Sequence, residues 1–140
     1  MTGNFITRDE VETIALGERF GSELRGGDFV AIYGDLGAGK THFVQGIGKA
    51  LNVREVVNSP TFTIVNEYHG TLDVYHIDLY RISSIKEILD LGFEEYVEAD
   101  AVCVVEWAEK LNGMLPEKRY EVIMTIGGEK VRNISISEVK

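Results

Sequence analysis

Two uninterrupted apolar runs are the strongest feature of the hydrophobic pattern along this chain. Residues 29–33 read FVAIY and residues 101–105 read AVCVV, with no charged position in either run. Parallel strands that are covered on both faces show this continuous pattern, because neither face meets water. The two runs therefore predict two buried strands near the centre of a sheet.

Helical patterns flank these runs. Apolar residues follow an imperfect helical stripe over residues 7–25, after a T-R-D-E capping box at residues 7–10. A second helix is expected from about residue 40 to residue 51. A third, short helix is expected between an S-I-K-E capping box at residues 84–87 and Gly92, which ends it.

Two further pairs of strands are expected as antiparallel hairpins. One pair comprises residues 61–65 and 72–77, and the other comprises residues 120–126 and 131–136, joined by Gly-Gly. The order of elements predicts a single α/β domain over residues 1–140. Its mixed sheet has parallel core strands and antiparallel hairpins, and helices flank it.

Composition and charge limit the functions that this domain can have. The chain has 140 residues, which suits one domain, and its formal net charge is −9. A domain that grips nucleic acid directly usually carries a basic surface, so we expect any nucleic acid to be held by a partner. The single cysteine, Cys103, excludes an internal disulfide. No apolar run approaches the ~20 residues of a membrane span and no signal pattern begins the chain, so a cytoplasmic location is expected.

The octet GDLGAGKT at residues 34–41 matches the phosphate-binding loop G-x-x-x-x-G-K-[ST] in full. Glycines let the backbone N–H groups wrap a phosphate, and the following helix presents its positive end to the anion. Lys40 can reach the β- and γ-phosphates, and the Thr41 hydroxyl can ligate Mg²⁺. A buried strand before the octet and a helix after it are the expected context, so the sequence predicts nucleoside triphosphate binding.

Hydrolysis also needs a second carboxylate for the metal and a group that orients water. Glu106 directly follows the apolar run 101–105, and Asp78 follows a shorter apolar strand. We favour Glu106 at the metal, since it ends the cleaner strand. His76 could support Asp78 on the same strand face or could be a packed histidine. Trp107 could likewise be a packing aromatic.

Four blocks, in this order, resemble the bacterial TsaE family: YGDLGAGKT, SPTFTIVNEY, YHIDLYR and VVEWAEKL, which begin at residues 33, 59, 75 and 104. The resemblance covers nearly the whole chain. It implies a small P-loop ATPase required for making threonylcarbamoyladenosine beside the anticodon of tRNAs. It also implies that ATP is hydrolysed while the protein is joined to the transferase TsaD and its paralogue TsaB, so that tRNA is reached only through these partners.

The resemblance also implies roles for individual residues. Lys40 and Thr41 would hold phosphate and Mg²⁺, Glu106 would be the metal-associated acid and Asp78 an acid needed for hydrolysis. The expected catalytic set is thus Asp78, Lys40 and Glu106, with Thr41 and Glu106 at the metal. The expected ATP-binding set is Glu10, Asp35, Leu36, Gly37, Ala38, Gly39, Lys40, Thr41, Trp107 and Arg132. A switch-like segment is expected at Ser59, Pro60, Thr61 and Phe62. Arg81 is the nearest candidate for an arginine finger, unless a partner supplies one.

Two other functions share the phosphate-binding loop. A small-molecule kinase would need a lid that excludes water, and no arginine-rich insert follows the P-loop helix among the seven arginines of the chain. A nucleotide-gated binding module, for which hydrolysis is incidental, would need the same site as a true ATPase. The sequence therefore disfavours the kinase and leaves the binding module open.

Overall fold

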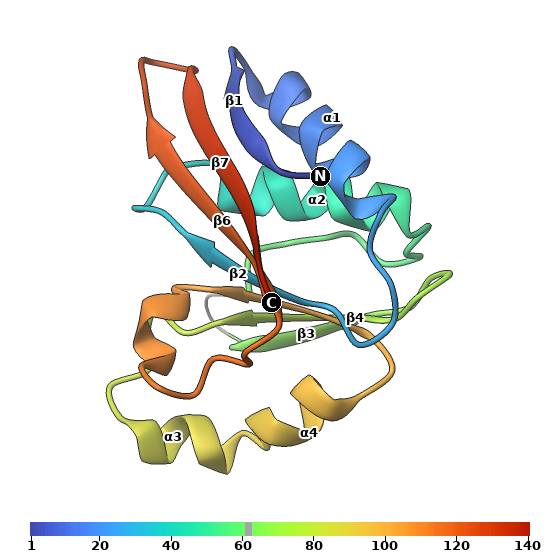
Figure 1. Cartoon of the computed structure of the whole chain (residues 1–140), viewed down its shortest axis with the longest axis vertical. Coiled ribbons are helices and arrows are strands. Elements are labelled where there is room, and N and C mark those ends of the chain that lie inside the picture. Colours follow the sequence, from blue (N-terminus) through green and yellow to red (C-terminus); the bar gives the residue numbers. More distant parts are fainter. Residues whose placement is uncertain (61–62) are drawn as a thin grey trace.

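The computed structural model describes residues 1–60 and 63–140. One seven-stranded sheet, in the order β1-β7-β6-β2-β5-β4-β3, runs through the molecule (Figure 1). The strands are β1 (Gly3–Thr7), β2 (Phe29–Tyr33), β3 (Val65–Tyr68), β4 (Val74–Asp78), β5 (Val102–Glu106), β6 (Arg119–Ile126) and β7 (Arg132–Val139). The helices are α1 (Glu10–Gly21), α2 (Lys40–Ala50), α3 (Ile85–Asp90), α4 (Phe93–Glu98) and the 3₁₀ turn η1 (Ala108–Leu111).

The sheet combines a parallel centre with antiparallel edges. Strand β2 pairs in parallel with β5 on one side and with β6 on the other, and β4 continues the parallel set beside β5. The hairpins β3–β4 and β6–β7, together with the β1–β7 pair, are antiparallel. This arrangement confirms the predicted α/β class and its mixed sheet. Both apolar runs became the adjacent central strands β2 and β5, as their continuous pattern requires.

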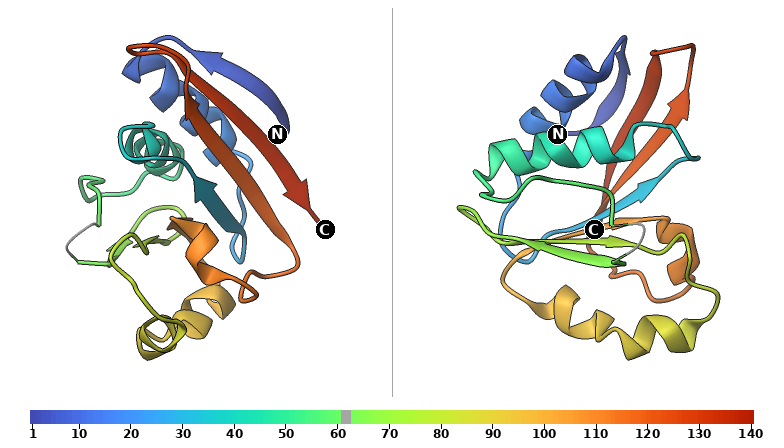
Figure 2. Two further views of the ribbon diagram at one scale, coloured as in Figure 1. Left: turned by 90° about the vertical axis from the view of Figure 1, so that its left-hand side faces the viewer. Right: turned by 180° about the vertical axis from the view of Figure 1, so that it is seen from behind.

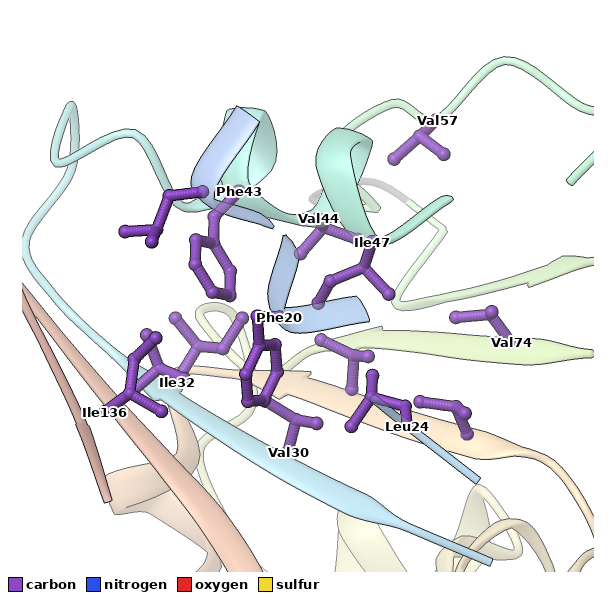
Figure 3. Close-up of a cluster of buried hydrophobic side chains, with 14 of the residues drawn as sticks. Phe20, Leu24, Val30, Ile32, Phe43, Val44, Ile47, Val57, Val74 and Ile136 are labelled. Carbon is purple, nitrogen blue, oxygen red and sulfur yellow. The ribbon is translucent and has the colours of Figure 1, made fainter. Parts of the chain in front are cut away.

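Helices cover the two faces of the sheet in two separate layers. Helices α1 and α2 lie on one face, and α3 and α4 lie on the other, a separation that the further views preserve (Figures 1 and 2). Each layer has its own apolar cluster. In the first cluster, Phe20 and Phe43 from the helices approach Val30 and Ile32 of β2 (Figure 3).

Helices α1 and α2 approach each other so closely that glycine is required at their contact. A Cβ on Gly17 would lie 2.2 Å from the carbonyl oxygen of Phe43, and one on Gly46 would lie 2.1 Å from that of Ile14. Real Cβ atoms do not tolerate such distances from backbone. The close contact fixes α2, and the first turn of α2 carries the end of the phosphate-binding loop.

The first helix begins later than the sequence pattern suggested, so the predicted capping box at residues 7–10 is wrong. Thr7 ends strand β1, an edge strand that the sequence did not reveal, and its hydroxyl lies 2.7 Å from that of Thr13. The helix cap is Asp9, whose carboxylate accepts from the N–H of Glu12 at 2.8 Å, while Glu12 accepts from the N–H of Arg8 at 2.7 Å. The helix also ends at Gly21, before the predicted residue 25.

Other elements differ in smaller ways. Strand β3 begins at Val65, later than predicted, and residues 61–62 lie outside the described part of the chain. The cap at Ser84 is confirmed, since its hydroxyl accepts from the N–H of Glu87 at 3.3 Å. Gly92 ends α3 but also precedes α4, which the acidic sequence of residues 93–98 did not predict. Within the described residues, no helix is both long and apolar enough to cross a bilayer.

Candidate nucleotide-binding site

A cavity of about 560 Å³ opens where strands β2, β4 and β5 end. This is the usual ligand position in α/β sheets, because loops diverge there and leave space between them. The wall consists of Asp9, Glu10, Thr13, Leu36, Gly37, Ala38, Gly39, Lys40, Thr41, His42, Ser59, Asp78, Tyr80, Glu106, Trp107, Glu129, Lys130 and Arg132. Segments from across the whole sequence therefore meet at the carboxyl ends of the central strands.

The phosphate-binding loop connects β2 directly to α2. Gly37 and Gly39 have φ angles of 82° and 92°, in the left-handed region that a side chain disfavours. Gly39 is the N-cap of α2, and it supplies no side-chain hydrogen bond to the first N–H groups of that helix. No acidic residue occupies the first turn of α2. The loop and helix start can therefore direct N–H groups and the positive helix end toward an anion.

Lys40 is buried inside this loop, with 6% of its surface exposed. Its ammonium group donates to the carbonyl oxygen of Gly34 and to that of Asp35 at 3.3 Å, and it lies 4.1 Å from the ring centre of Trp107. Burial lowers the pKa of Lys40, while the nearby carboxylates of Glu106 and Asp78 act in the opposite direction. The lysine is thus held by groups that phosphate oxygens could replace.

The two predicted acids lie side by side. Asp78 and Glu106 are partners in the register of the parallel pair β4–β5, and they are only 4% and 3% exposed. Burial raises the pKa of Asp78, and the N–H of Tyr80, which donates to Asp78 Oδ1 at 2.8 Å, opposes this rise. Both carboxylates line the cavity together with Thr41.

This donor set suits Mg²⁺ that arrives with a nucleotide. Mg²⁺ prefers oxygen ligands, keeps several waters and is usually held by one or two carboxylates plus substrate phosphates. Thr41, Asp78 and Glu106 supply a hydroxyl and two carboxylates on one wall of the cavity. Among the described residues, no cluster of three or more His, Cys, Asp or Glu side chains forms a ready-made metal cage. The residues therefore fit a metal whose remaining ligands are phosphate and water.

Trp107 lines the cavity and adopts an unusual backbone conformation. Its φ angle of 58° lies in the left-handed region, which costs a residue with a side chain about 1–3 kcal/mol. Its ring lies over Lys40 and packs 4.9 Å from the ring of Tyr80, centre to centre. Strain of this kind persists where the surrounding structure enforces it, often at functional sites. The structure thus places Trp107 on the cavity wall.

Arg132 and Glu10 also line the cavity. One terminal nitrogen of Arg132 donates to the carbonyl oxygen of Gly37 at 2.9 Å, which ties β7 to the loop. The Nε atom of Arg132 is buried and has no hydrogen-bond partner within the described residues. A buried donor without a partner is costly, so this atom is suited to receive an acceptor from a ligand.

The structure brings most of the predicted residues together, with a few exceptions. Asp35 is exposed and does not belong to the described cavity wall, to which the loop contributes Leu36, Gly37, Ala38, Gly39, Lys40 and Thr41. Ser59 lines the wall, and Pro60 is buried next to it. The predictions for Thr61 and Phe62 fall outside the described residues. Arg81 is exposed and is not part of the cavity wall as described.

Sequence reasoning missed several residues of the cavity wall. They are Asp9, Thr13, His42, Tyr80, Glu129 and Lys130. Two of them had a local signal, because His42 directly follows the phosphate-binding octet and Tyr80 is two positions after Asp78. The turn that carries Glu129 and Lys130 had none, since its place depends on the pairing of β6 with β7 and β2.

His76 has a different partner from the one considered. Its Nε2 atom lies 2.5 Å from Glu106 Oε2 on the neighbouring strand, and its Nδ1 atom lies 3.3 Å from the Tyr68 hydroxyl. Both contacts are buried. The histidine therefore supports Glu106 directly, which only the strand register could reveal.

Comparisons with known proteins agree with this geometry. Residues 7–134 match the family described as "Threonylcarbamoyl adenosine biosynthesis protein TsaE". A Bacillus subtilis protein described as "tRNA threonylcarbamoyladenosine biosynthesis protein TsaE" is 40% identical over 129 residues, covering 91% of this chain and 80% of the relative. The protein of the same description from Treponema pallidum is 36% identical, covering 94% and 98%. The crystal structure of Bacillus subtilis YdiB matches with a TM-score of 0.86 at 33% identity, covering 100% of this chain and 87% of that one. The chain belongs to the TsaE family.

Proposed function

We propose that the chain binds Mg²⁺ and ATP in this cavity and hydrolyses ATP as a component of tRNA threonylcarbamoyladenosine biosynthesis. One observation carries the activity: Lys40, Asp78 and Glu106, from three different elements, converge on one cavity beside the phosphate-binding loop. The pathway follows from membership of a family whose relatives carry that name.

Each residue of the loop has a defined task in this proposal. Backbone N–H groups from Leu36 to Thr41 surround the phosphates, and the start of α2 adds its positive end. The Lys40 ammonium exchanges the carbonyl oxygens of Gly34 and Asp35 for oxygens of the β- and γ-phosphates. Because this exchange replaces neutral acceptors by charged ones, it strengthens the hydrogen bonds of a buried cation.

The two acids divide the remaining work. Thr41 and Glu106 would hold Mg²⁺, which when bound neutralises charge on the transferring phosphoryl group. Asp78 orients the attacking water and accepts its proton, and burial raises the pKa of this carboxyl toward values that favour a base. Positioning and electrostatics supply most of the catalysis in such phosphoryl transfers.

The other end of the nucleotide lies against Glu10 and Arg132, whereas Trp107 lies beside the Lys40 ammonium. Glu10 and Arg132 both line the cavity, and the orphan Nε atom of Arg132 offers a donor there. An arginine that stabilises the transition state is not present in the described cavity wall near the acids, since Arg132 is held at Gly37. We therefore expect slow turnover by the isolated chain.

We further propose that the chain acts on the complex of TsaD with TsaB and contacts tRNA only through these partners. The net charge of −9 disfavours direct binding to a phosphate backbone. Ser59 lines the cavity, so a bound γ-phosphate can change the position of Ser59 and of the protein surface next to Ser59. A difference of this kind is needed if the nucleotide state is to be sensed by a partner.

The test is ATP turnover by the purified chain, alone and with the assembled TsaB–TsaD pair. We expect slow phosphate release alone and faster release with the pair, and Lys40→Ala should abolish both. Docking that depends on an ATP analogue without any turnover would instead identify a nucleotide-gated binding module. Tight tRNA binding by the isolated chain would contradict the indirect role.

A further inference from the structure

A buried chain of hydrogen bonds leads away from Glu106 toward a distant loop. Glu106 Oε2 lies 2.5 Å from His76 Nε2, and His76 Nδ1 lies 3.3 Å from the Tyr68 hydroxyl. The Tyr68 hydroxyl in turn contacts the backbone of Asn58, at 3.2 Å from its nitrogen and 3.0 Å from its carbonyl oxygen. Asn66 Nδ2 also donates to the Tyr68 hydroxyl, at 3.3 Å.

The strand register places these side chains on one face of the sheet. Asp78 is the direct partner of Glu106 across β4–β5, and Val74 is the direct partner of Tyr68 across β3–β4. His76 is therefore the diagonal neighbour of both Glu106 and Tyr68, at a separation that long side chains can bridge. The line of contacts crosses three adjacent strands and reaches the loop that follows α2.

The donors and acceptors of this line are compatible throughout. A carboxylate oxygen only accepts, so His76 donates to Glu106 from Nε2. The Tyr68 hydroxyl has one proton, which the Asn58 carbonyl oxygen at 3.0 Å and His76 Nδ1 at 3.3 Å share, and its oxygen accepts from the N–H groups of Asn58 and Asn66. Every member of the line thus has a partner, as a buried polar network requires.

Packing alone does not account for these residues. His76 is fully buried, Tyr68 is 3% exposed, and the cluster on this face of the sheet is otherwise apolar. Valine or leucine would fill such positions without the cost of burying polar groups. Polar side chains at these positions are better explained by the two groups that they connect, Glu106 and the backbone of Asn58.

We propose that His76 and Tyr68 are positioning residues that couple Glu106 to residues 58–60. They hold the Glu106 carboxylate in the orientation that serves Mg²⁺, and they fix Asn58, whose neighbour Ser59 lines the nucleotide cavity. A second connection supports this coupling, because the N–H of Ile64 donates to Pro60 O and the N–H of Asp78 donates to Ile64 O. A change at either end is therefore transmitted to the other, and the coupling is reciprocal. The role at the metal rests on the proposed function.

The first test removes one hydroxyl that lies two side chains away from the proposed metal. Tyr68→Phe should weaken the binding of a non-hydrolysable ATP analogue about tenfold when Mg²⁺ is present, the lower end of the loss typical of outer ligand supports. Binding in EDTA should not change. The matched control is Tyr75→Phe, the same chemical change on the opposite face of β4, where Tyr75 packs on Tyr96. Equal losses with and without Mg²⁺, or the same loss in the control, would overturn the proposal.

The second test asks whether the effect passes through His76. Tyr68→Phe should cause no further loss of Mg²⁺-dependent affinity in a His76→Phe background, because the connection is already broken. Thermal melting of both variants checks that they fold. A full additional loss from Tyr68→Phe would show that Tyr68 acts independently of His76, and the proposed coupling would be wrong.

The third test separates this coupling from the proposed function, since it needs no nucleotide. Amide exchange of Asn58, whose N–H donates to the Tyr68 hydroxyl, is followed in the free protein by NMR. Glu106→Ala should accelerate this exchange several-fold, whereas the exposed control Glu109→Ala should not. Unchanged exchange would overturn the coupling even if ATP binds. Faster exchange in a chain that fails to bind Mg²⁺ and ATP would support the coupling and contradict the proposed function.

Discussion

The two faces of the sheet differ in what they bury. The face beneath α3, α4 and η1 buries an apolar cluster, which includes Phe29, Ile77 and Phe93. The face beneath α1 and α2 also has a large apolar cluster, but it ends in buried polar groups at the carboxyl ends of the strands, among them Lys40, His76 and Glu106. Most buried polar residues of the proposed nucleotide site thus belong to one face, while the core of the other face is apolar.

Strand alternation explains this division. Successive side chains of a strand point to opposite faces, so Ile77 joins the apolar face and its neighbours His76 and Asp78 do not. A single strand therefore contributes to the stable layer and to the site at the same time. We expect substitutions on the two faces to separate stability from nucleotide binding.

The largest expected effect is a loss of stability on the apolar face. Phe93 is 2% exposed and makes an edge contact with Phe29, with ring centres 6.2 Å apart. Phe93→Ala should lower the free energy of unfolding by about 3–5 kcal/mol, which denaturant titration would measure. The exposed control Leu89→Ala in the same layer should stay within about 0.5 kcal/mol. Nucleotide affinity of the folded Phe93→Ala protein should be unchanged, and a large loss would show that the two faces are coupled.

The second-largest expected effect is a loss of ATP affinity, caused by a substitution among the buried polar residues on the face beneath α1 and α2. Lys40→Ala should weaken ATP binding by about 2–5 kcal/mol, as expected for a desolvated charge pair. The fold should remain intact, because burial lowers the pKa of Lys40 and the charged form gains little from folding. Calorimetry measures the affinity, and Lys49→Ala, an exposed lysine on the same helix, is the control. Unchanged affinity in Lys40→Ala would reject the phosphate-binding role.

The parts of this face that the sequence predicted are those with a local signal. The octet at residues 34–41 specifies a phosphate-binding loop by its own glycines and lysine. The apolar run 101–105 predicts a buried strand, so Glu106, which follows it, is placed at the carboxyl end of that strand. Strand β1 and the support of Glu106 by His76 depend instead on pairing between distant segments. Trp107 lines the cavity from a left-handed backbone conformation, which no residue pattern predicts.

A third expected effect distinguishes the two acids. Glu106→Gln should weaken the Mg²⁺-dependent part of ATP binding, because it removes a charge at the cation. Asp78→Asn should preserve binding and reduce turnover in a single-turnover assay. The exposed Glu109→Gln serves as a control for the change in charge. Normal binding by Glu106→Gln together with impaired binding by Asp78→Asn would mean that the roles are reversed.

A smaller effect should appear in the pH dependence of stability. Burial raises the pKa of Asp78 above its usual 3.8, so the folded protein holds this proton to higher pH than the unfolded chain does. The free energy of unfolding contributed by Asp78 should therefore fall as the pH rises between these two pKa values. Asp78→Asn should lack this slope and should gain stability relative to the wild type at pH 7. Urea titrations at pH 4 and pH 7 measure the difference, and an equal stability change at both pH values would contradict it.

The smallest expected effect is spectroscopic and reports on the boundary between the phosphate-binding loop and the cavity. Trp107 is the single tryptophan, and the Lys40 ammonium lies 4.1 Å from its ring centre. If phosphate draws Lys40 away from the ring, the indole loses a cation–π contact worth about 0.5–2 kcal/mol, and its emission should change on addition of Mg²⁺ and ATP. Lys40→Ala should change the emission of the free protein and abolish the response to nucleotide. A response that persists in Lys40→Ala would assign the signal to direct contact between nucleotide and Trp107, and no response in the wild type would show that Lys40 keeps its place over the ring.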